Sequence, residues 1–407
     1  MACKARNVHG DNVARVNPQV LIWARKTAGL DLETAARKIS LNAAAGTSGA
    51  GRLAALEHGD SEPTAAQLRK MAQHYHRPLL AFYMPNVPAP AQVGQDFRTL
   101  PDRGDPGNIL LAALLRDVKA RQALVRDALE DDEDVAKASL IGAKAGVRSV
   151  SKLSDALVTA IKFDRAEFRA RGSAEDAFAY LRALVEAQGV FVLLAGDCGH
   201  WSTAIDVGIF RGFEIADPLA PFIVINDQDA KAAWSFTLFH ELAHLLLGES
   251  GVSGGPPQAG IEQLCNDTAA AALIAGDEIT DLHLDDAGGD ISQINALADR
   301  ARVSRSMVAY QLFRVGRLTQ QRWEDLRDQF RTEWLSGKLR EKEKNKGSVG
   351  GPNWYVVRRH RLGAALLSVA RRGIADGTLT PTRAARMLGV KPMAVYPLLA
   401  DSRHAIA

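Results

Sequence analysis

The spacing of apolar residues changes along the chain, and the change predicts an α+β fold that is predominantly helical. Apolar residues first recur at helical spacing, as at Val20, Leu21 and Ala24. Helical patterns of this kind continue to about residue 188. The period then shortens over three segments that we interpret as strands of a small sheet, and it becomes helical again afterwards. The three segments are GVFVLLAG, FRGFEIAD and APFIVIND.

Loop-like segments divide this pattern into four parts. We predict an N-terminal helical module at 1–90, a linker and helical region at 91–172, a domain with the sheet at 173–335, and a linker with a helical extension at 336–407. The charged and then glycine-rich segment LREKEKNKGSVGGPN marks the last linker.

Composition is consistent with a globular protein of several domains. The chain has 407 residues, 47% of them apolar and 24% charged, and its net charge of +3 does not by itself indicate nucleic acid. Cys3, Cys198 and Cys265 are odd in number and far apart, which argues against a disulfide framework. No apolar run approaches the roughly 20 residues of a membrane span. We therefore expect a cytoplasmic protein without a membrane partner, and an oligomer is compatible with the sequence.

The segment FTLFHELAHLLLG carries the clearest chemistry. His240 and His244 lie four residues apart, so on a helix both imidazoles are on one face and can reach the same metal ion. Glu241 lies beside them and can accept a proton from the attacking water. The competing interpretation is a helix with two buried histidines that hydrogen bonds satisfy. Three protein ligands and an open position are typical of a catalytic zinc site.

The third ligand has to come from another part of the chain. Glu262 is the best candidate, because it begins a helical segment after a Gly- and Pro-rich loop that lets this segment fold back beside the first helix. Cys265, one helical turn further on, is an alternative, since thiolate is a good zinc ligand. Asp267 is a third candidate.

FTLFHELAHLLLG followed by IEQLCNDTAAAALI resembles the ImmA/IrrE family of zinc metallopeptidases. The resemblance covers about residues 175–320. It implies a gluzincin-like domain in which His240, His244 and Glu262 bind Zn²⁺, Glu241 is the general base, and a sheet brings the substrate backbone beside the metal. The chain departs from the family pattern at two places. Gln311 replaces the family's usual arginine, and LIAGDE stands where a proline usually follows the second helix. Neither departure affects the ligands or the general base.

The N-terminal module resembles the Xre/Cro-like helix-turn-helix domain through WAR at 23–25, AARK at 35–38, LEHG at 56–59 and PTAAQL at 63–68. In such a domain, the second helix of the helix-turn-helix motif lies in the major groove of DNA. The corresponding segment is rich in glycine and poor in basic residues, so a degenerate module that packs on a protein is the alternative. The residues that could contact DNA are Arg37, Lys38, Asn42, Thr47, Ser48 and Arg52.

Two functions remain open at this stage. The first is a regulatory zinc metalloendopeptidase that cleaves a specific protein partner, such as a repressor or a toxin-associated regulator. The alternative is an antitoxin and transcriptional regulator of a toxin–antitoxin system, which neutralises a toxin by binding and represses its promoter, with zinc structural or secondary. Tyr310 and His200 are candidates for stabilising the oxyanion. The basic cluster 358–361 near the C-terminus is interpreted as a basic patch or a solvated helix face.

Overall fold

The computed structural model describes residues 15–44, 46–88, 106–130, 138–248, 259–282, 284, 289–345 and 353–400. It divides into two compact units, one formed mainly by residues before 93 and the other mainly by residues from 114 onward. Most described residues are helical and one three-stranded sheet is present, so the predicted α+β, predominantly helical fold is confirmed. Residues 91–105, the first part of the predicted linker and helical region at 91–172, lie outside the described residues.

The first unit is a small helical bundle whose helices begin at polar caps. The side chains of Asn17, Asp31, Ser48 and Thr64 each accept a backbone N–H of the helix that follows. The buried Arg25 guanidinium donates to both Glu57 carboxylate oxygens, at 2.6 and 2.8 Å. Its elements are α1 (Pro18–Thr27), α2 (Leu32–Lys38), α3 (Gly49–His58), α4 (Ala65–His74) and the 3-10 helix η1 (Leu79–Tyr83).

The second unit surrounds the sheet with helices. Its elements before the sheet is complete are α5 (Pro106–Glu130), which begins in the first unit, α6 (Val150–Ile161), α7 (Arg165–Arg169), α8 (Ala174–Glu186), β1 (Phe191–Leu194), η3 (Trp201–Thr203), β2 (Gly212–Ile215) and β3 (Phe222–Ile225). The later elements are α9 (Lys231–Leu247), α10 (Ala259–Leu273), α11 (Gly276–Thr280), α12 (Gly289–Ala301), α13 (Arg305–Arg314), α14 (Gln320–Asn345), α15 (Trp354–Leu362), α16 (Ala364–Ala375), α17 (Pro381–Leu388), η4 (Pro392–Ala394) and α18 (Val395–Leu399).

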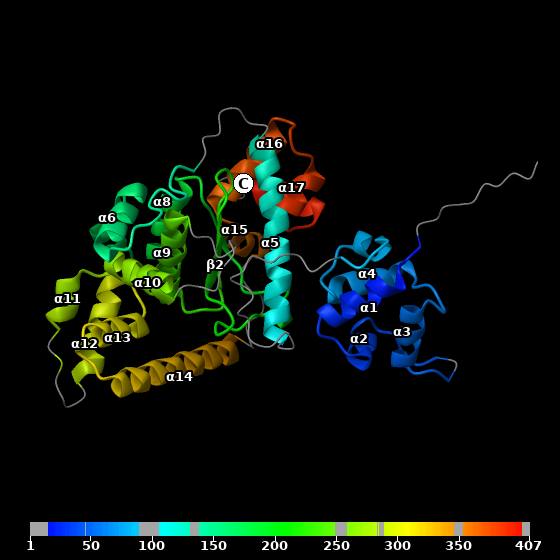
Figure 1. The fold of residues 1–407 in the computed structure, drawn as a ribbon, viewed down its shortest axis with the longest axis horizontal. Coiled ribbons are helices and arrows are strands. Elements are labelled where there is room, and N and C mark those ends of the chain that lie inside the picture. The colour runs from blue at the N-terminus through cyan, green and yellow to red at the C-terminus, as the bar shows by residue number, and fades with distance from the viewer. Residues whose placement is uncertain are drawn as a thin grey trace, which may run out of the picture. The chain divides into compact units, whose positions relative to one another are not determined.

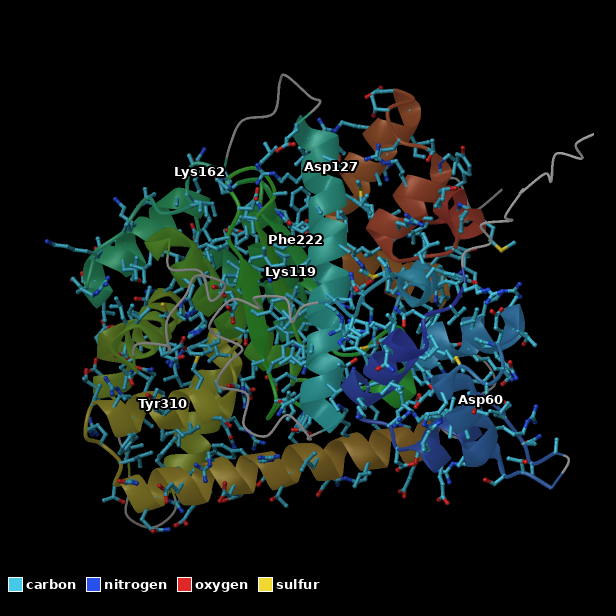
Figure 2. All side chains as sticks on the ribbon, turned by 45° about the vertical axis from the view of Figure 1, so that its right-hand side comes forward. Asp60, Lys119, Asp127, Lys162, Phe222 and Tyr310 are labelled. Atoms are coloured by element: carbon cyan, nitrogen blue, oxygen red, sulfur yellow. The ribbon has the colours of Figure 1, made fainter. Side chains whose placement is uncertain are left out.

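The three strands lie inside the three segments predicted from the sequence. Their order in the sheet is β1-β3-β2, with β1 parallel and β2 antiparallel to β3. Phe222 on the central strand (Figure 2) stacks on Phe191 of β1 with ring centroids 5.1 Å apart. β2 is therefore an edge strand of this sheet.

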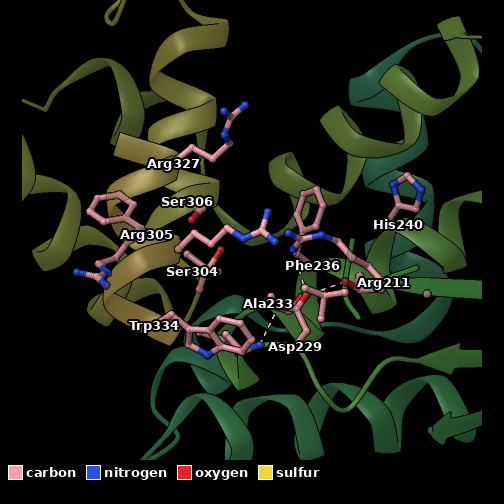
Figure 3. A pocket seen from close by; sticks show the side chains of 18 of the residues that line it. Arg211, Asp229, Ala233, Phe236, His240, Ser304, Arg305, Ser306, Arg327 and Trp334 are labelled. Atoms are coloured by element: carbon pink, nitrogen blue, oxygen red, sulfur yellow. Dashed lines mark hydrogen bonds and ion pairs between the residues drawn. The ribbon is translucent and has the colours of Figure 1, made fainter. Parts of the chain in front are cut away.

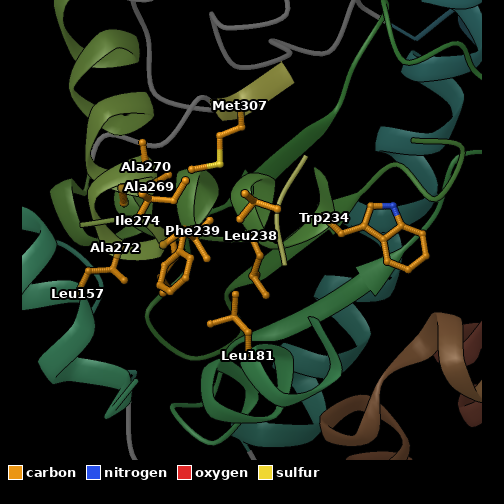
Figure 4. Close-up of a cluster of buried hydrophobic side chains, with 14 of the residues drawn as sticks. Leu157, Leu181, Trp234, Leu238, Phe239, Ala269, Ala270, Ala272, Ile274 and Met307 are labelled. Atoms are coloured by element: carbon orange, nitrogen blue, oxygen red, sulfur yellow. The ribbon is translucent and has the colours of Figure 1, made fainter. Parts of the chain in front are cut away.

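Helix α9 is apolar on most of its circumference because it lies inside the unit. Figure 1 shows α8, α9 and α10 on one side of the sheet and α5 and α15 on the other. Leu238, Phe239 and Trp234 of α9 pack with residues of α6, α8 and α10 in the main hydrophobic core (Figure 4). Gly248 ends the helix in the left-handed conformation, at φ 67°. This packing fixes α9 and α10 relative to each other.

The C-terminal helices belong to the second unit and are fixed to it by a buried ion pair. Arg182 of α8 pairs with Glu186 and donates to the carbonyls of Val192, His360 and Arg361. The other oxygen of Glu186 accepts two backbone N–H groups at the start of α16, at 3.0 and 3.2 Å. The pair therefore connects α8, β1 and the α15–α16 junction.

From the sequence, the basic cluster 358–361 was either a basic patch or a solvated helix face. In the structure its arginines have partners within the fold. Arg358 donates to the carbonyls of Leu388 and Gly389, and Arg359 donates to carbonyls at the end of α18. Arg361 forms ion pairs with Asp197 and Asp227. These three guanidiniums hold the helical extension together and attach it to the sheet domain.

Part of the predicted last linker is helical. Helix α14 runs to Asn345, through the segment LREKEKN that we expected to be a linker. Lys, Glu, Arg and Leu all favour helix, so the charged composition extends α14 rather than ending it. No helix among the described residues is long and apolar enough to cross a membrane.

Candidate metal centre

Helices α9 and α10 bring His240, His244 and Glu262 together at one point. The Nε2 atoms of the two histidines are 3.1 Å apart. Each Nε2 lies 3.4 Å from a different carboxylate oxygen of Glu262. The helical spacing of the histidines and the return of the chain through α10 produce this convergence.

These distances fit a single zinc ion. Ligands at about 2.0–2.1 Å from a tetrahedral zinc lie about 3.4 Å from one another. The two Nε2 atoms are 3.1 Å apart, and each is 3.4 Å from one Glu262 oxygen, so a single ion can lie between the imidazoles and the carboxylate. Two imidazoles and one carboxylate are also a donor set that is typical of catalytic zinc sites.

The two alternative third ligands have other partners. Cys265 is buried and forms a hydrogen bond with His244, so it can orient that imidazole, but it is not one of the three clustered residues. Asp267 accepts from Arg314 at 3.0 Å and from Gln263 at 2.7 Å. Glu262 is therefore the candidate whose oxygens face both histidines.

Glu241 lies beneath the edge strand β2. A Cβ atom placed on Gly212 would lie 2.6 Å from Glu241 Oε1 and 2.6 Å from Thr237 Cγ2, so the absence of a side chain lets β2 pass close to α9. The buried Glu214, also on β2, is hydrogen-bonded to Glu241. Sequence reasoning missed both β2 residues, because they are distant from the motif in the chain.

The electrostatics of this site favour a bound cation. Burial and the neighbouring carboxylate of Glu214 raise the pKa of Glu241 well above its usual range. Hydrogen bonds from His240 and His244 lower the pKa of Glu262. Although burial lowers the pKa of His244, hydrogen bonds to Cys265 and Glu262 raise it overall. Positive charge is therefore stabilised where the three donor atoms meet.

A pocket of about 750 Å³ has His240, Glu241 and Glu262 in its lining (Figure 3). Phe236 and His240 of α9 line one wall, together with Arg211, which directly precedes β2. Residues of α13 and α14 line the opposite wall, among them Arg305 and Trp334. The pocket thus gives access to His240, Glu241 and Glu262.

The two candidates for stabilising an oxyanion are not among the residues that line this pocket. The Tyr310 hydroxyl donates to Gln263 Oε1 at 3.3 Å. His200 Nδ1 is 2.7 Å from Ser202 Oγ in an exposed turn. The structure gives no support to either role.

The six residues that could contact DNA lie around the segment between α2 and α3 in the first unit. Ser48 caps α3 by accepting from Gly51 N–H, and Arg52 donates to the carbonyl of Asn42. Thr47 forms a backbone bridge with Ala44. Arg37 and Lys38 are exposed at the end of α2. Several of these side chains thus stabilise the turn itself, and DNA binding stays a prediction.

Comparison with known protein families identifies part of the second unit. Residues 206–313 match the family model described as the IrrE N-terminal-like domain, which is a peptidase family. The match contains β2, β3, α9 and α10, and therefore every residue of the proposed metal centre. Searches of curated proteins and of solved structures gave no match.

The match thus supports a peptidase domain of the ImmA/IrrE type within a longer chain. The match accounts for residues 206–313 of the 407. α14 and the C-terminal helices lie outside it.

Proposed function

We propose that the chain is a regulatory, zinc-dependent metallopeptidase that hydrolyses a peptide bond in a specific protein partner. The observation that carries this proposal is the convergence of His240, His244 and Glu262 at a pocket that also contains Glu241. The match to a peptidase family over the same residues supports the reaction class.

The side chains of the site have separable roles. His240, His244 and Glu262 would hold the metal. When bound, zinc supplies a Lewis acid for the scissile carbonyl and a positive charge that favours the ionised form of Glu241. The carboxylate of Glu241 takes a proton from the attacking water and delivers it to the leaving amine. Glu214, hydrogen-bonded to Glu241, fixes the orientation of that carboxylate.

The edge strand β2 provides a means of holding the substrate. One edge of β2 is hydrogen-bonded to β3. Gly212 of β2 lines the pocket. An extended substrate segment can add to such an edge through backbone hydrogen bonds. Because β2 passes directly over Glu241, a segment bound there would present its backbone to the general base and the metal ligands.

The partner we propose is a repressor or a toxin-associated regulator, which the N-terminal helical unit helps to select. The alternative, an antitoxin that neutralises a toxin by binding alone, makes the opposite prediction about Glu241. A Glu241→Gln variant retains the shape of the site and all three metal ligands but lacks the base.

The test is co-expression of the chain with the products of neighbouring genes, comparing the wild type with Glu241→Gln. We expect the wild type to yield a cleaved partner. The variant should bind zinc but leave the partner intact, trapped as a complex. A Glu241→Gln variant that cleaves the partner, or that protects cells as well as the wild type does, would contradict the proposal.

A further inference from the structure

The second wall of the pocket comes from helix α14, which follows the part of the chain that matches the peptidase family. Five pocket-lining residues belong to this helix: Arg327, Phe330, Arg331, Trp334 and Leu335. Part of the wall opposite the metal ligands is thus built by residues that lie outside the matched segment 206–313.

The pocket-facing side of α14 follows directly from helical spacing. Arg327, Arg331 and Trp334 are separated by four and three residues, so they lie in a row on one face. The adjacent face carries Leu326 and Phe330, which are buried and hold the helix against the domain. Packing therefore fixes which side chains of α14 line the pocket.

The far end of the row is anchored beside the start of α9. Lys338 Nζ donates to the carbonyl of Gln228 at 3.0 Å and lies 4.9 Å from the centroid of the Trp334 ring. The Trp334 end of the wall is therefore near the N-terminus of α9, whereas the metal ligand His240 is further along that helix.

The wall formed by α12, α13 and α14 carries more positive than negative charge. It contributes Arg305, Arg327 and Arg331 to the pocket lining, against the single carboxylate of Asp299. Arg305 already pairs with Glu333 at 2.8 Å.

The other two arginines are more available to a ligand. Among the described residues, Arg327 forms an ion pair only with the exposed Asp328, at 2.9 Å, and such surface pairs contribute little stability. Its guanidinium also lies 5.4 Å from the centroid of the Trp323 ring. Arg331 is exposed and, apart from a longer-range attraction to Asp328, forms no ion pair or hydrogen bond with any described residue. Its guanidinium can thus bind a carboxylate of a ligand without losing an existing partner.

We propose that the Arg327–Arg331–Trp334 row of α14 is a specificity subsite that selects substrate segments carrying an acidic side chain next to a bulky apolar one. The acidic side chain binds Arg331 with Arg327 beside it, and the apolar side chain packs on Trp334 and Leu335. The proposal rests on the proposed function in that the bound segment is the peptidase substrate.

The length of α9 sets where the subsite lies relative to the scissile bond. Pocket-lining Ala233 and His240 are seven residues apart, which is about 10 Å along a helix. An extended peptide covers about 10 Å in three residues. The selected side chains are therefore expected about three residues from the bond that is cleaved.

The test is selection of displayed random decapeptides on the immobilised full-length Glu241→Gln chain, with and without zinc. We expect enrichment of peptides in which Asp or Glu neighbours a large apolar residue. Arg331→Glu should weaken binding of a selected peptide by roughly tenfold and shift the enriched residue to Lys or Arg. Arg340→Glu is the matched control, because Arg340 is exposed on the same helix but does not line the pocket. It should leave the selection unchanged.

The outcomes separate this subsite from the proposed function. Enrichment without acidic residues, no enrichment at all, or the same enrichment in Arg331→Glu would overturn the subsite. Selected peptides are then incubated with the zinc-loaded wild type. Binding that depends on Arg331 without any cleavage would count against peptidase activity while supporting the subsite. Cleavage that is unchanged by Arg331→Glu would support peptidase activity and count against the subsite.

Discussion

The close approach of β2 to α9 at Gly212 makes a sharp prediction about stability. In Gly212→Ala, the new Cβ would lie 2.6 Å from both Glu241 Oε1 and Thr237 Cγ2. Neither neighbour can move freely, since Glu241 and Thr237 are both buried on a packed helix. We expect the overpacking to lower the free energy of unfolding by about 1–3 kcal/mol.

A second substitution tests whether the clash is the cause. Thr237→Ser removes Cγ2 and keeps the hydroxyl that donates to the carbonyl of Ala233. On its own it should cost up to about 1 kcal/mol, because a buried methyl group is lost. In the Gly212→Ala background it should instead recover stability, giving a coupling energy of about 1 kcal/mol in the double-mutant cycle.

The assay is urea denaturation of the full chain followed by circular dichroism. Gly337→Ala is the matched control, since nothing lies within 4 Å of its added Cβ and Gly337 is inside α14. It should stabilise the protein by up to about 1 kcal/mol through helix propensity. A loss below about 0.5 kcal/mol for Gly212→Ala, or strict additivity with Thr237→Ser, would refute this account of the strand position.

Two further predictions concern buried and partly buried ion pairs. Arg182→Met leaves Glu186 buried without its partner and should cost about 3–5 kcal/mol in urea denaturation, with part of the loss recovered by adding Glu186→Gln; a loss under 1 kcal/mol would contradict the role of the pair. Glu278 has a lowered pKa because Arg169 donates to its carboxylate, so the stability it contributes is present above about pH 4.3 and is lost as pH falls through the folded-state pKa. Glu278→Gln should therefore cost about 1–2 kcal/mol at pH 7 and much less near pH 3, and an equal cost at both pH values would contradict the assignment.

Local sequence patterns predicted the strands and the helix that carries the two histidines. The two histidines are related by one turn of a helix, and apolar segments with few breakers predicted the strands. Glu262 was the best candidate from its position after the loop, and the family resemblance ranked Asp267 lower. The choice between them depends on how α10 faces α9, which is a tertiary property that the structure supplies.

The features that the sequence did not reveal arise from contacts between distant residues. Gly212 reads as an ordinary strand glycine until β2 is placed over Glu241. From the sequence, Arg182 is expected on the polar side of an amphipathic helix. It is nevertheless buried, because the carbonyls of His360 and Arg361 accept hydrogen bonds from its guanidinium. In α14, the charged residues 339–345 that suggested a linker continue the helix whose earlier turns form the pocket wall. Charge patterns alone cannot distinguish a solvated helix face from one that meets a carbonyl or a pocket.

The most direct test of the central claim is the zinc content of the full-length protein, purified without chelators and measured by elemental analysis. The account predicts one zinc per chain in the wild type and in Glu241→Gln. It also predicts that zinc is lost in His244→Ala and strongly reduced in Glu262→Gln, while circular dichroism shows that both variants fold. A wild type that contains no zinc and takes up none on addition would contradict the account, as would His244→Ala and Glu262→Gln variants that retain one zinc per chain.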